Sequence, residues 1–105
     1  MYYEYPLETG IETEPARPEY FRNVRIYPNP FNAAANIAFR LPGQAFVTVK
    51  VYDITGAEVA VLLSEIKQAG NHKIRWDASE FSSGIYFVNL KANDASITRK
   101  MDLVK

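Results

Sequence analysis

Cysteine is absent from the 105-residue chain, and histidine occurs once, at His72. Without cysteine, the chain has no disulfide framework and no thiolate ligand for a metal. No apolar run approaches the roughly 18–20 residues that span a bilayer as a helix. The opening residues, MYYEYPLETG, lack the basic start and apolar centre of a secretory signal peptide. Motifs such as a glycine-rich phosphate loop or an acidic calcium loop are also missing. We therefore expect no metal, no cofactor and no membrane span.

Two features of the sequence bear on catalysis, and neither supports it. His72 shares its alternation with Ile74 and Trp76, which is typical of a half-buried strand residue, and no obvious nucleophile accompanies it. The stretch WDASE, residues 76–80, holds two carboxylates and a serine. However, Asp followed by Ala-Ser at the end of a strand is typical of an Asx turn. The sequence therefore predicts a protein that is not an enzyme.

The charges balance overall but are unevenly distributed. The 12 basic and 12 acidic side chains give a formal net charge of zero, so the overall balance does not suggest nucleic acid or an anionic membrane as a partner. Residues 1–22 carry five glutamates against two arginines, and three prolines interrupt any helix there. We therefore predict an acidic, proline-containing linker over residues 1–22, followed by a single domain over residues 23–105.

Apolar and polar residues alternate from Val24 onward, which is typical of strands with one buried face. Turn residues separate the runs at Pro42–Gly43, at DITG (residues 53–56) and at Asn93–Asp94. The apolar members of the clearest runs are Ile37, Phe39 and Leu41, then Val47, Val49 and Val51, then Tyr86, Val88 and Leu90. Short strands at close, even intervals predict an all-β fold, an Ig-like antiparallel β-sandwich of about seven strands.

Residues 57–68, AEVAVLLSEIKQ, fit two patterns. Val59, Leu62, Leu63 and Ile66 lie at helical spacing, whereas Val59, Val61 and Leu63 lie at strand spacing. Hairpin signals flank the segment on both sides. We therefore favour a strand through Leu63 followed by a loop, with a helix as the alternative.

The stretch FSSGIY, residues 81–86, has the spacing of a tyrosine corner, in which a tyrosine hydroxyl at the start of a strand bonds back to the preceding crossover. Gly84 and Tyr86 are the residues of this motif, and the alternative is that Tyr86 is only a core aromatic. Trp76 shares the apolar phase of its strand, so we predict that it is buried. These residues are therefore assigned structural roles.

Three aromatic residues, Phe46, Tyr52 and Phe87, fall on strand faces opposite to the apolar alternation. They form a possible binding surface for a carbohydrate or a protein partner. The alternative, which we favour, is that they pair across the sheet, as outward aromatics commonly do.

The segment YPNPFN, residues 27–32, precedes the first clear strand and contains two prolines and two asparagines. Pro28 and Pro30 restrict their own φ and bias the residues before them toward extended backbone, so the entering chain is stiff. Asn29 and Asn32 are expected to satisfy the backbone of the turn. Phe31 is expected to enter the core.

Several stretches together carry a family likeness. They are YPNPFN, a strand ending in LP, VTVKVYDITGAEV, AGNHKIRWDAS, SSGIYFVNL and the terminal TRKMDLVK. In this order, from Val24 to Lys105, they resemble the type A C-terminal sorting domain of the type IX (Por) secretion system. The pattern is also similar to the Ig-like domain of the flagellar hook-capping protein. The chain departs from the sorting family at Ala33–Ala35, where Pro and Ser/Thr are usual, and at Asp102 in a strand that is often more apolar.

The resemblance implies a function and a set of partners. It implies a secretion signal that the type IX translocon reads at the end of a larger exported protein, behind an upstream passenger domain. A surface sortase would cut in the linker. The protein would be exported through the periplasm to the cell surface or extracellular space of a Gram-negative bacterium, with an export signal upstream of Met1. The alternative is a non-catalytic accessory module that binds carbohydrate or packs against an upstream catalytic domain.

The resemblance and the position of the terminal strand together suggest where the sorting signal lies. The strand places positive charge beside apolar residues, and the predicted signal residues are Ile97, Arg99, Lys100, Met101, Leu103, Val104 and Lys105. A purely structural role is the alternative, because Ile97, Met101 and Leu103 share the phase that would complete the sandwich.

Overall fold

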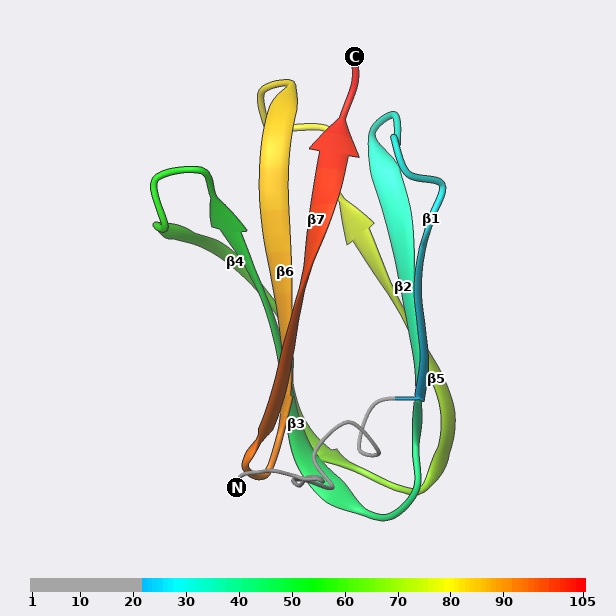
Figure 1. Cartoon of the computed structure of the whole chain (residues 1–105). Helices are drawn as coiled ribbons and strands as arrows, with labels where there is room; N and C mark the ends of the chain where they lie inside the picture. Colours follow the sequence, from blue (N-terminus) through cyan, green and yellow to red (C-terminus); the bar gives the residue numbers. More distant parts are fainter. Residues whose placement is uncertain (1–21) are drawn as a thin grey trace, which may run out of the picture.

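The alternating runs form seven β-strands in the computed structural model, which describes residues 22–105 (Figure 1). The strands are β1 (Arg22–Tyr27), β2 (Ala34–Leu41), β3 (Ala45–Asp53), β4 (Glu58–Lys67), β5 (Gly70–Asp77), β6 (Gly84–Ala92) and β7 (Ala95–Leu103). The all-β prediction is confirmed. Nothing in this part of the chain is a helix that could span a membrane. The predicted linker lies outside the described residues except for Arg22, which begins β1.

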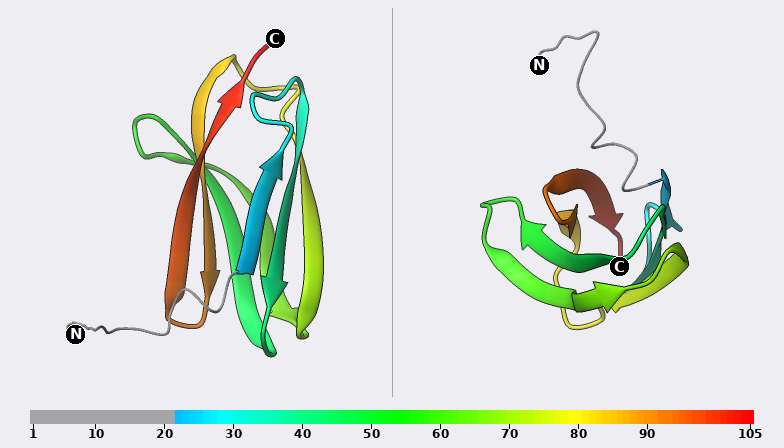
Figure 2. Two further views of the ribbon diagram at one scale, coloured as in Figure 1. Left: turned by 45° about the vertical axis from the view of Figure 1, so that its right-hand side comes forward. Right: turned by 90° about the horizontal axis from the view of Figure 1, so that it is seen from below.

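The strands form two antiparallel sheets packed face to face (Figure 2). One sheet has the order β1-β2-β5 and the other the order β4-β3-β6-β7. Seven strands divided in this way form the Ig-like sandwich that the sequence predicted. In constant-type immunoglobulin domains the fourth strand joins the first sheet, whereas β4 here pairs with β3 in the second sheet.

The core lies between the sheets and contains the predicted apolar runs. Because side chains alternate along a strand, every second residue of β2, β3 and β6 points inward. The buried members of these runs are Ile37, Phe39, Leu41, Val47, Val49, Val51, Tyr86, Val88 and Leu90, joined by Phe31, Trp76, Met101 and Leu103 from the other segments. The predictions that Phe31 and Trp76 are buried are confirmed.

The ambiguous segment is strand, but the predicted end of that strand was wrong. β4 continues past Leu63 to Lys67, because its last residues pair with the start of β3, including Ile66 with Phe46. The register shifts twice along this pair, so that Val59 and Leu62 are each an extra residue on β4. These two bulges, three residues apart, interrupt the two-residue alternation of β4. The apolar residues of residues 57–68 therefore occur at a spacing similar to that of a helix.

The described chain begins and ends at opposite ends of the sandwich. In Figure 1, β1 begins near the lower end, and the chain leaves β7 at the upper end. The loops before β2 and before β6 lie at the same upper end as the C-terminus (Figures 1 and 2). We call this end, formed by residues 28–33, 78–83 and 101–105, the C-terminal pole.

Candidate functional site

The segment before β2 is joined to the end of β7 by the side chain of one asparagine. Asn29 Nδ2 donates a hydrogen bond to the carbonyl oxygen of Lys100 at 3.1 Å, and Asn29 Oδ1 accepts one from the backbone amide of Asp102 at 3.0 Å. The side-chain amide thus pairs with β7 as the backbone of a neighbouring strand would. The expectation that Asn29 satisfies its own turn was therefore wrong. The side chain of Asn32 forms no hydrogen bond with the described part of the chain.

Phe31 continues this pairing with its backbone. Its amide donates to the carbonyl oxygen of Asp102 at 2.9 Å, and its carbonyl oxygen accepts from the amide of Val104 at 2.8 Å. These bonds make a short parallel bridge between Phe31 and Leu103. Residues 29–31, which we call the strap, therefore cover the outer edge of β7 from Lys100 to Val104.

Pro28 and Pro30 lie on either side of Asn29, and both are exposed. Neither ring is part of the core, so their contribution is to the backbone of the strap. With φ restricted at Pro28, just before the strap, and at Pro30 within it, the strap has few alternative conformations. A stiff backbone suits a segment whose one side chain must meet two groups of β7 at once.

Two serines hold Lys105, which lies two residues after the end of β7. The backbone amide of Lys105 donates to Ser83 Oγ at 3.1 Å, and Lys105 Nζ donates to the carbonyl oxygen of Ser79 at 2.6 Å. Both serines belong to the loop between β5 and β6. The end of β7 is therefore fixed from one side by the strap and from the other by this loop.

A cluster of aromatic rings supports the C-terminal pole from inside. The Trp76 ring centroid lies 5.6 Å from that of Phe31, 5.3 Å from that of Phe81 and 5.4 Å from that of Tyr86. The Tyr86 hydroxyl donates to the carbonyl oxygen of Ser82 at 2.7 Å, which is the tyrosine-corner bond that the sequence predicted. The cluster thus joins the strap to the loop that holds Lys105.

Gly84 occupies the turn into β6, between this loop and Tyr86. Its φ is +152°, a conformation that residues with a side chain rarely adopt. This explains the glycine in FSSGIY, because a residue with a side chain would be strained in this backbone conformation.

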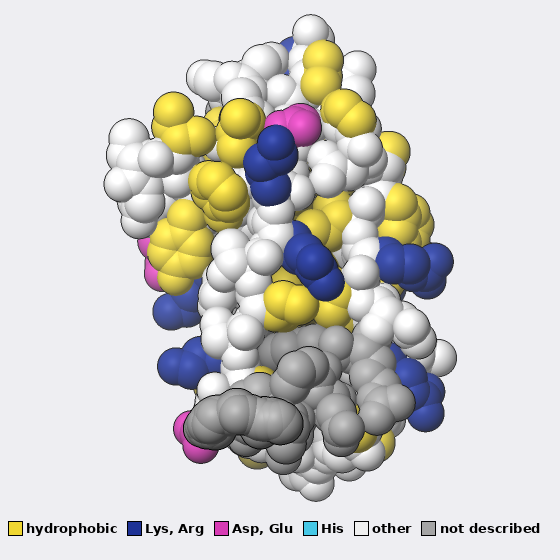
Figure 3. Space-filling model, viewed as in Figure 1, with side chains coloured by type: hydrophobic (Ala, Val, Ile, Leu, Met, Phe, Trp, Pro, Cys, Tyr) yellow, Lys and Arg dark blue, Asp and Glu magenta, His cyan; other side chains and the backbone are white. Residues whose placement is uncertain are grey.

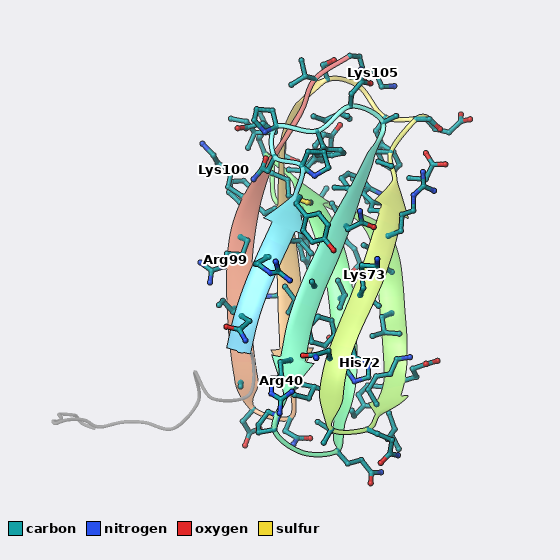
Figure 4. All side chains as sticks on the ribbon, turned by 90° about the vertical axis from the view of Figure 1, so that its right-hand side faces the viewer. Arg40, His72, Lys73, Arg99, Lys100 and Lys105 are labelled. Carbon is teal, nitrogen blue, oxygen red and sulfur yellow. The ribbon has the colours of Figure 1, made fainter. Side chains whose placement is uncertain are left out.

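The predicted signal residues, in β7 and the two residues after it, divide into buried and exposed groups. Met101 and Leu103 are buried and Ile97 is half-buried, whereas Arg99, Lys100, Val104 and Lys105 are exposed. Arg99 pairs with the buried Val88, so it occupies an inward position of an edge strand. Figure 4 shows Arg99 and Lys100 projecting from β7 away from the sandwich. In Figure 3, basic side chains lie among apolar ones along this side of the molecule.

The outer edge of β7 is covered over only part of its length. The strap bonds to the carbonyl oxygens of Lys100 and Asp102 and to the amides of Asp102 and Val104. Along β7, the even-numbered residues therefore direct their backbone N–H and C=O groups away from β6. Ser96 and Thr98 follow the same alternation. Within residues 22–105, no other strand pairs with β7 on this side. The outward backbone groups of Ser96 and Thr98 therefore have no strand partner within residues 22–105.

The comparison with protein families agrees with this geometry. A family model described as the secretion system C-terminal sorting domain matches residues 25–103, which include the strap, both sheets and β7. The chain belongs to this family of sorting domains. A sorting domain of this kind is a C-terminal signal for type IX secretion, and such a signal implies export to the cell surface or the extracellular space. The family is known for sorting and not for catalysis.

The sorting domain is also similar to part of a solved structure. The similar chain belongs to the structure of PorZ, an essential bacterial surface component of the type-IX secretion system of human oral-microbiomic Porphyromonas gingivalis. The TM-score is 0.54 and the identity 22%, over 79% of this chain and 12% of the other. At this identity the likeness is one of fold, and the sorting domain spans a small part of that protein. No curated protein matches the sequence.

The three outward aromatics do not form one surface on the sorting domain. Tyr52 and Phe87 are cross-strand neighbours on the outer face of the second sheet, next to Lys100 in the same row. Phe46 lies at the other end of β3, beside Ile66, and is 50% exposed. The sheet thus brings two of the three together, in the kind of cross-strand pair that the sequence favoured.

His72 is a strand residue, as expected. It is half-buried, its ring packs against Phe39 at 5.5 Å, and its Nε2 donates to the carbonyl oxygen of Gln68 at 2.7 Å. Both contacts hold the start of β5 to its neighbours. The described residues contain no group of three or more His, Asp or Glu that could hold a metal.

Two carboxylates of the sorting domain have a lowered pKa, and both belong to turns. The hydrogen bond from the Thr55 hydroxyl at 2.6 Å is the main cause of the lowered pKa of Asp53, followed by that from the Ala57 amide at 3.1 Å. The Ser79 amide, at 3.0 Å, is the main cause of the lowered pKa of Asp77. Asp77 thus forms the Asx turn predicted for WDASE.

Sequence reasoning missed the residues that hold the C-terminal pole together across long distances. Neither the partners of Asn29 nor the roles of Ser79 and Ser83 were predicted. No local pattern could have indicated them, because Asn29 and Asp102 are 73 positions apart and Ser79 and Lys105 are 26 apart.

Proposed function

We propose that the type IX translocon recognises the folded edge strand β7 of this sorting domain together with the two residues that follow it. The recognised surface consists of the exposed residues Arg99, Lys100, Val104 and Lys105. Met101 and Leu103 are buried against both sheets. They contribute indirectly, by fixing the position of the strand that carries the exposed residues.

The observation that supports this proposal most is the half-covered edge of β7. An extended segment of a receptor can pair with the free backbone groups of Ser96 and Thr98 without unfolding the sandwich. Charged side chains on an edge strand ordinarily discourage pairing between copies of a chain. Arg99 and Lys100 therefore restrict pairing to a receptor segment with acidic side chains.

The domain arrangement and the further partners belong to the same proposal. Residues 1–22 connect an upstream passenger domain to the sorting domain at residues 23–105, and a surface sortase cuts within that linker after export. The passenger passes through the periplasm of a Gram-negative bacterium before it reaches the cell surface. The structural roles of Asp53, Asp77 and His72 support a role without catalysis.

The proposal is tested by fusing residues 1–105 behind a signal peptide and a reporter in a host with a working type IX system. The intact fusion should place the reporter on the cell surface. Deletion of residues 102–105 removes the covered end of β7 together with Val104 and Lys105. The reporter should then remain in the periplasm, where protease resistance checks that the domain is still folded.

Leu103→Ala is the matched control for this deletion. It removes a buried side chain but keeps every exposed residue of the proposed surface. If this variant is folded, it should be secreted as the intact fusion is. Secretion of a folded deletion variant at the full-length level would exclude the end of β7 and residues 104–105 from the recognised surface.

A further inference from the structure

The outer face of the β1-β2-β5 sheet carries a dense group of cationic and amide side chains that the sorting role does not use. The face is formed by Asn23, Arg25, Tyr27, Asn36, Ala38, Arg40, Asn71, Lys73 and Arg75. Figure 4 looks onto this sheet, with Arg40 and Lys73 labelled on β2 and β5. Except for the half-buried Asn36 and the buried Ala38, all of these residues are exposed.

The strand register arranges these side chains in rows. The central row consists of Arg25, Ala38 and Lys73, which are direct cross-strand neighbours. One cationic side chain therefore lies on each side of the Ala38 methyl group. Neighbouring strands are about 4.8 Å apart, which separates the two backbone positions by roughly 10 Å. In the next row, Arg40 on β2 is the cross-strand neighbour of Asn71 on β5.

The small side chain of Ala38 leaves a hollow in the middle of the face. This open depression has a volume of about 640 Å³, within the usual range for small-molecule sites. Its lining includes Asn23, Arg25, Asn71 and Lys73, so it offers amide and cationic groups on two sides. The Arg25 guanidinium lies 5.6 Å from the centre of the Tyr27 ring, which holds that cation at the rim.

Little on this face neutralises the positive charge. Asp77, at the end of β5 beside Arg75, is the one acidic residue in β1, β2 and β5. Arg25, Arg40 and Lys73 form no salt bridge with any residue of the range 22–105. Arg25 and Lys73 therefore face solvent at the lining of one hollow, and Arg40 faces solvent in the next row of the same face. This arrangement favours a ligand that brings several negative charges.

We propose that this face binds an acidic oligosaccharide, a sugar chain that carries carboxylates. Arg25 and Lys73 would pair with carboxylates on successive sugars. The amides of Asn23 and Asn71 can both donate to and accept from hydroxyl groups. The Tyr27 ring offers an apolar surface to the C–H groups of a sugar ring.

The position of the hollow favours a sugar chain over an acidic peptide. The hollow is centred on β2, whose backbone is paired with β1 on one side and β5 on the other. An extended peptide gains affinity mainly from backbone bonds to a free sheet edge, and the centre of a sheet offers none. Recognition here must use side chains alone, which suits a ligand rich in hydroxyl and carboxylate groups.

The test is a calorimetric titration of the 105-residue chain with a tetramer of galacturonic acid at low salt. The expected dissociation constant is below about 1 mM, and the affinity should fall as salt rises. Arg25→Ala combined with Lys73→Ala should weaken binding about tenfold or more. Lys91→Ala, an exposed lysine on the opposite sheet, should leave the affinity unchanged, and circular dichroism should confirm that both variants are folded.

Two further ligands define the results that would overturn the proposal. A neutral galactose tetramer should bind at least about tenfold more weakly, because it leaves the cations unpaired. Hexaglutamate should also bind more weakly, since it lacks hydroxyl groups for the amides. Equal binding of either ligand, no binding of the acidic tetramer, or unchanged affinity in the folded double variant would each contradict an acidic-sugar site on this face.

Discussion

Asn29 Oδ1 accepts a hydrogen bond from the backbone amide of Asp102 at 3.0 Å, although 73 positions separate the two residues. The same side chain donates to the carbonyl oxygen of Lys100. One amide thus links the first loop of the domain to its last strand. The family likeness was carried partly by YPNPFN and partly by the terminal strand, and these two stretches are in direct contact in the fold.

Asn29→Ala should lower the free energy of unfolding by about 1–3 kcal/mol, because it removes two hydrogen bonds of about 0.5–1.5 kcal/mol each. Urea denaturation followed by fluorescence measures the change. Asn32→Ala is the matched control, since its side chain is exposed and forms no hydrogen bond within residues 22–105, and it should cost less than about 0.5 kcal/mol. Equal losses in the two variants would contradict the strap.

Tyr86→Phe should destabilise the domain by about 1–2 kcal/mol, because it leaves the carbonyl oxygen of Ser82 without its part-buried donor. Tyr27→Phe removes an exposed hydroxyl that has no partner in the described chain and should change stability by less than about 0.5 kcal/mol. Parallel denaturation of both variants measures the difference. A Tyr86 variant as stable as the Tyr27 variant would show that the corner bond contributes nothing.

Trp76→Ala should cost about 3–5 kcal/mol, as expected when a large aromatic is removed from a core. This is a large share of the roughly 5–15 kcal/mol that stabilises a small domain. Trp76 is the only tryptophan of the chain, so native fluorescence reports directly on its surroundings and should be blue-shifted. A loss below about 1 kcal/mol, typical of a surface change, would contradict the aromatic cluster.

Asp53→Asn should weaken the DITG turn in a way that depends on pH. Because the pKa of Asp53 is lowered in the folded state, its carboxylate stabilises the fold above the unfolded pKa of about 3.9. That stabilisation is lost as the pH falls through the folded pKa. The difference in stability between wild type and Asp53→Asn should therefore be largest near pH 6 and shrink below about pH 4.

Thr55→Val provides the control for this pH dependence. It removes the hydroxyl that contributes most to the lowered pKa of Asp53 but keeps the carboxylate. Denaturation at several pH values should show a smaller acid-induced loss for Thr55→Val than for wild type. Identical pH profiles for wild type and Asp53→Asn would rule out a stabilising role for the Asp53 carboxylate.

The sequence predicted those parts of the fold that local patterns encode. The alternation of β2, β3 and β6 indicated their inward residues, and the spacing of FSSGIY indicated the bond from Tyr86 to Ser82. β4 was harder to define because the bulges at Val59 and Leu62 break its alternation. A bulge depends on the partner strand, so one strand read alone does not reveal it.

The sequence predicted which residues of β7 are buried but not the contacts that hold this strand. Position in the chain pointed to β7, and periodicity correctly placed Met101 and Leu103 in the core. The pairing of Asn29 with β7 depends on two segments that meet only when both sheets have formed. The cationic face likewise combines residues from β1, β2 and β5, whose neighbours are set by strand register and not by sequence distance.

Secretion of a Lys100→Glu variant tests the central claim most directly. Lys100 and Lys91 are both exposed lysines on adjacent strands of the same sheet, and neither side chain forms a salt bridge within residues 22–105. Each is changed to Glu in the reporter fusion, and the fraction of reporter on the surface of cells with a type IX system is measured. Lys100→Glu should fall clearly below wild type while remaining folded, and Lys91→Glu should match wild type. Wild-type delivery of the Lys100 variant, or an equal fall in both, would contradict recognition at β7.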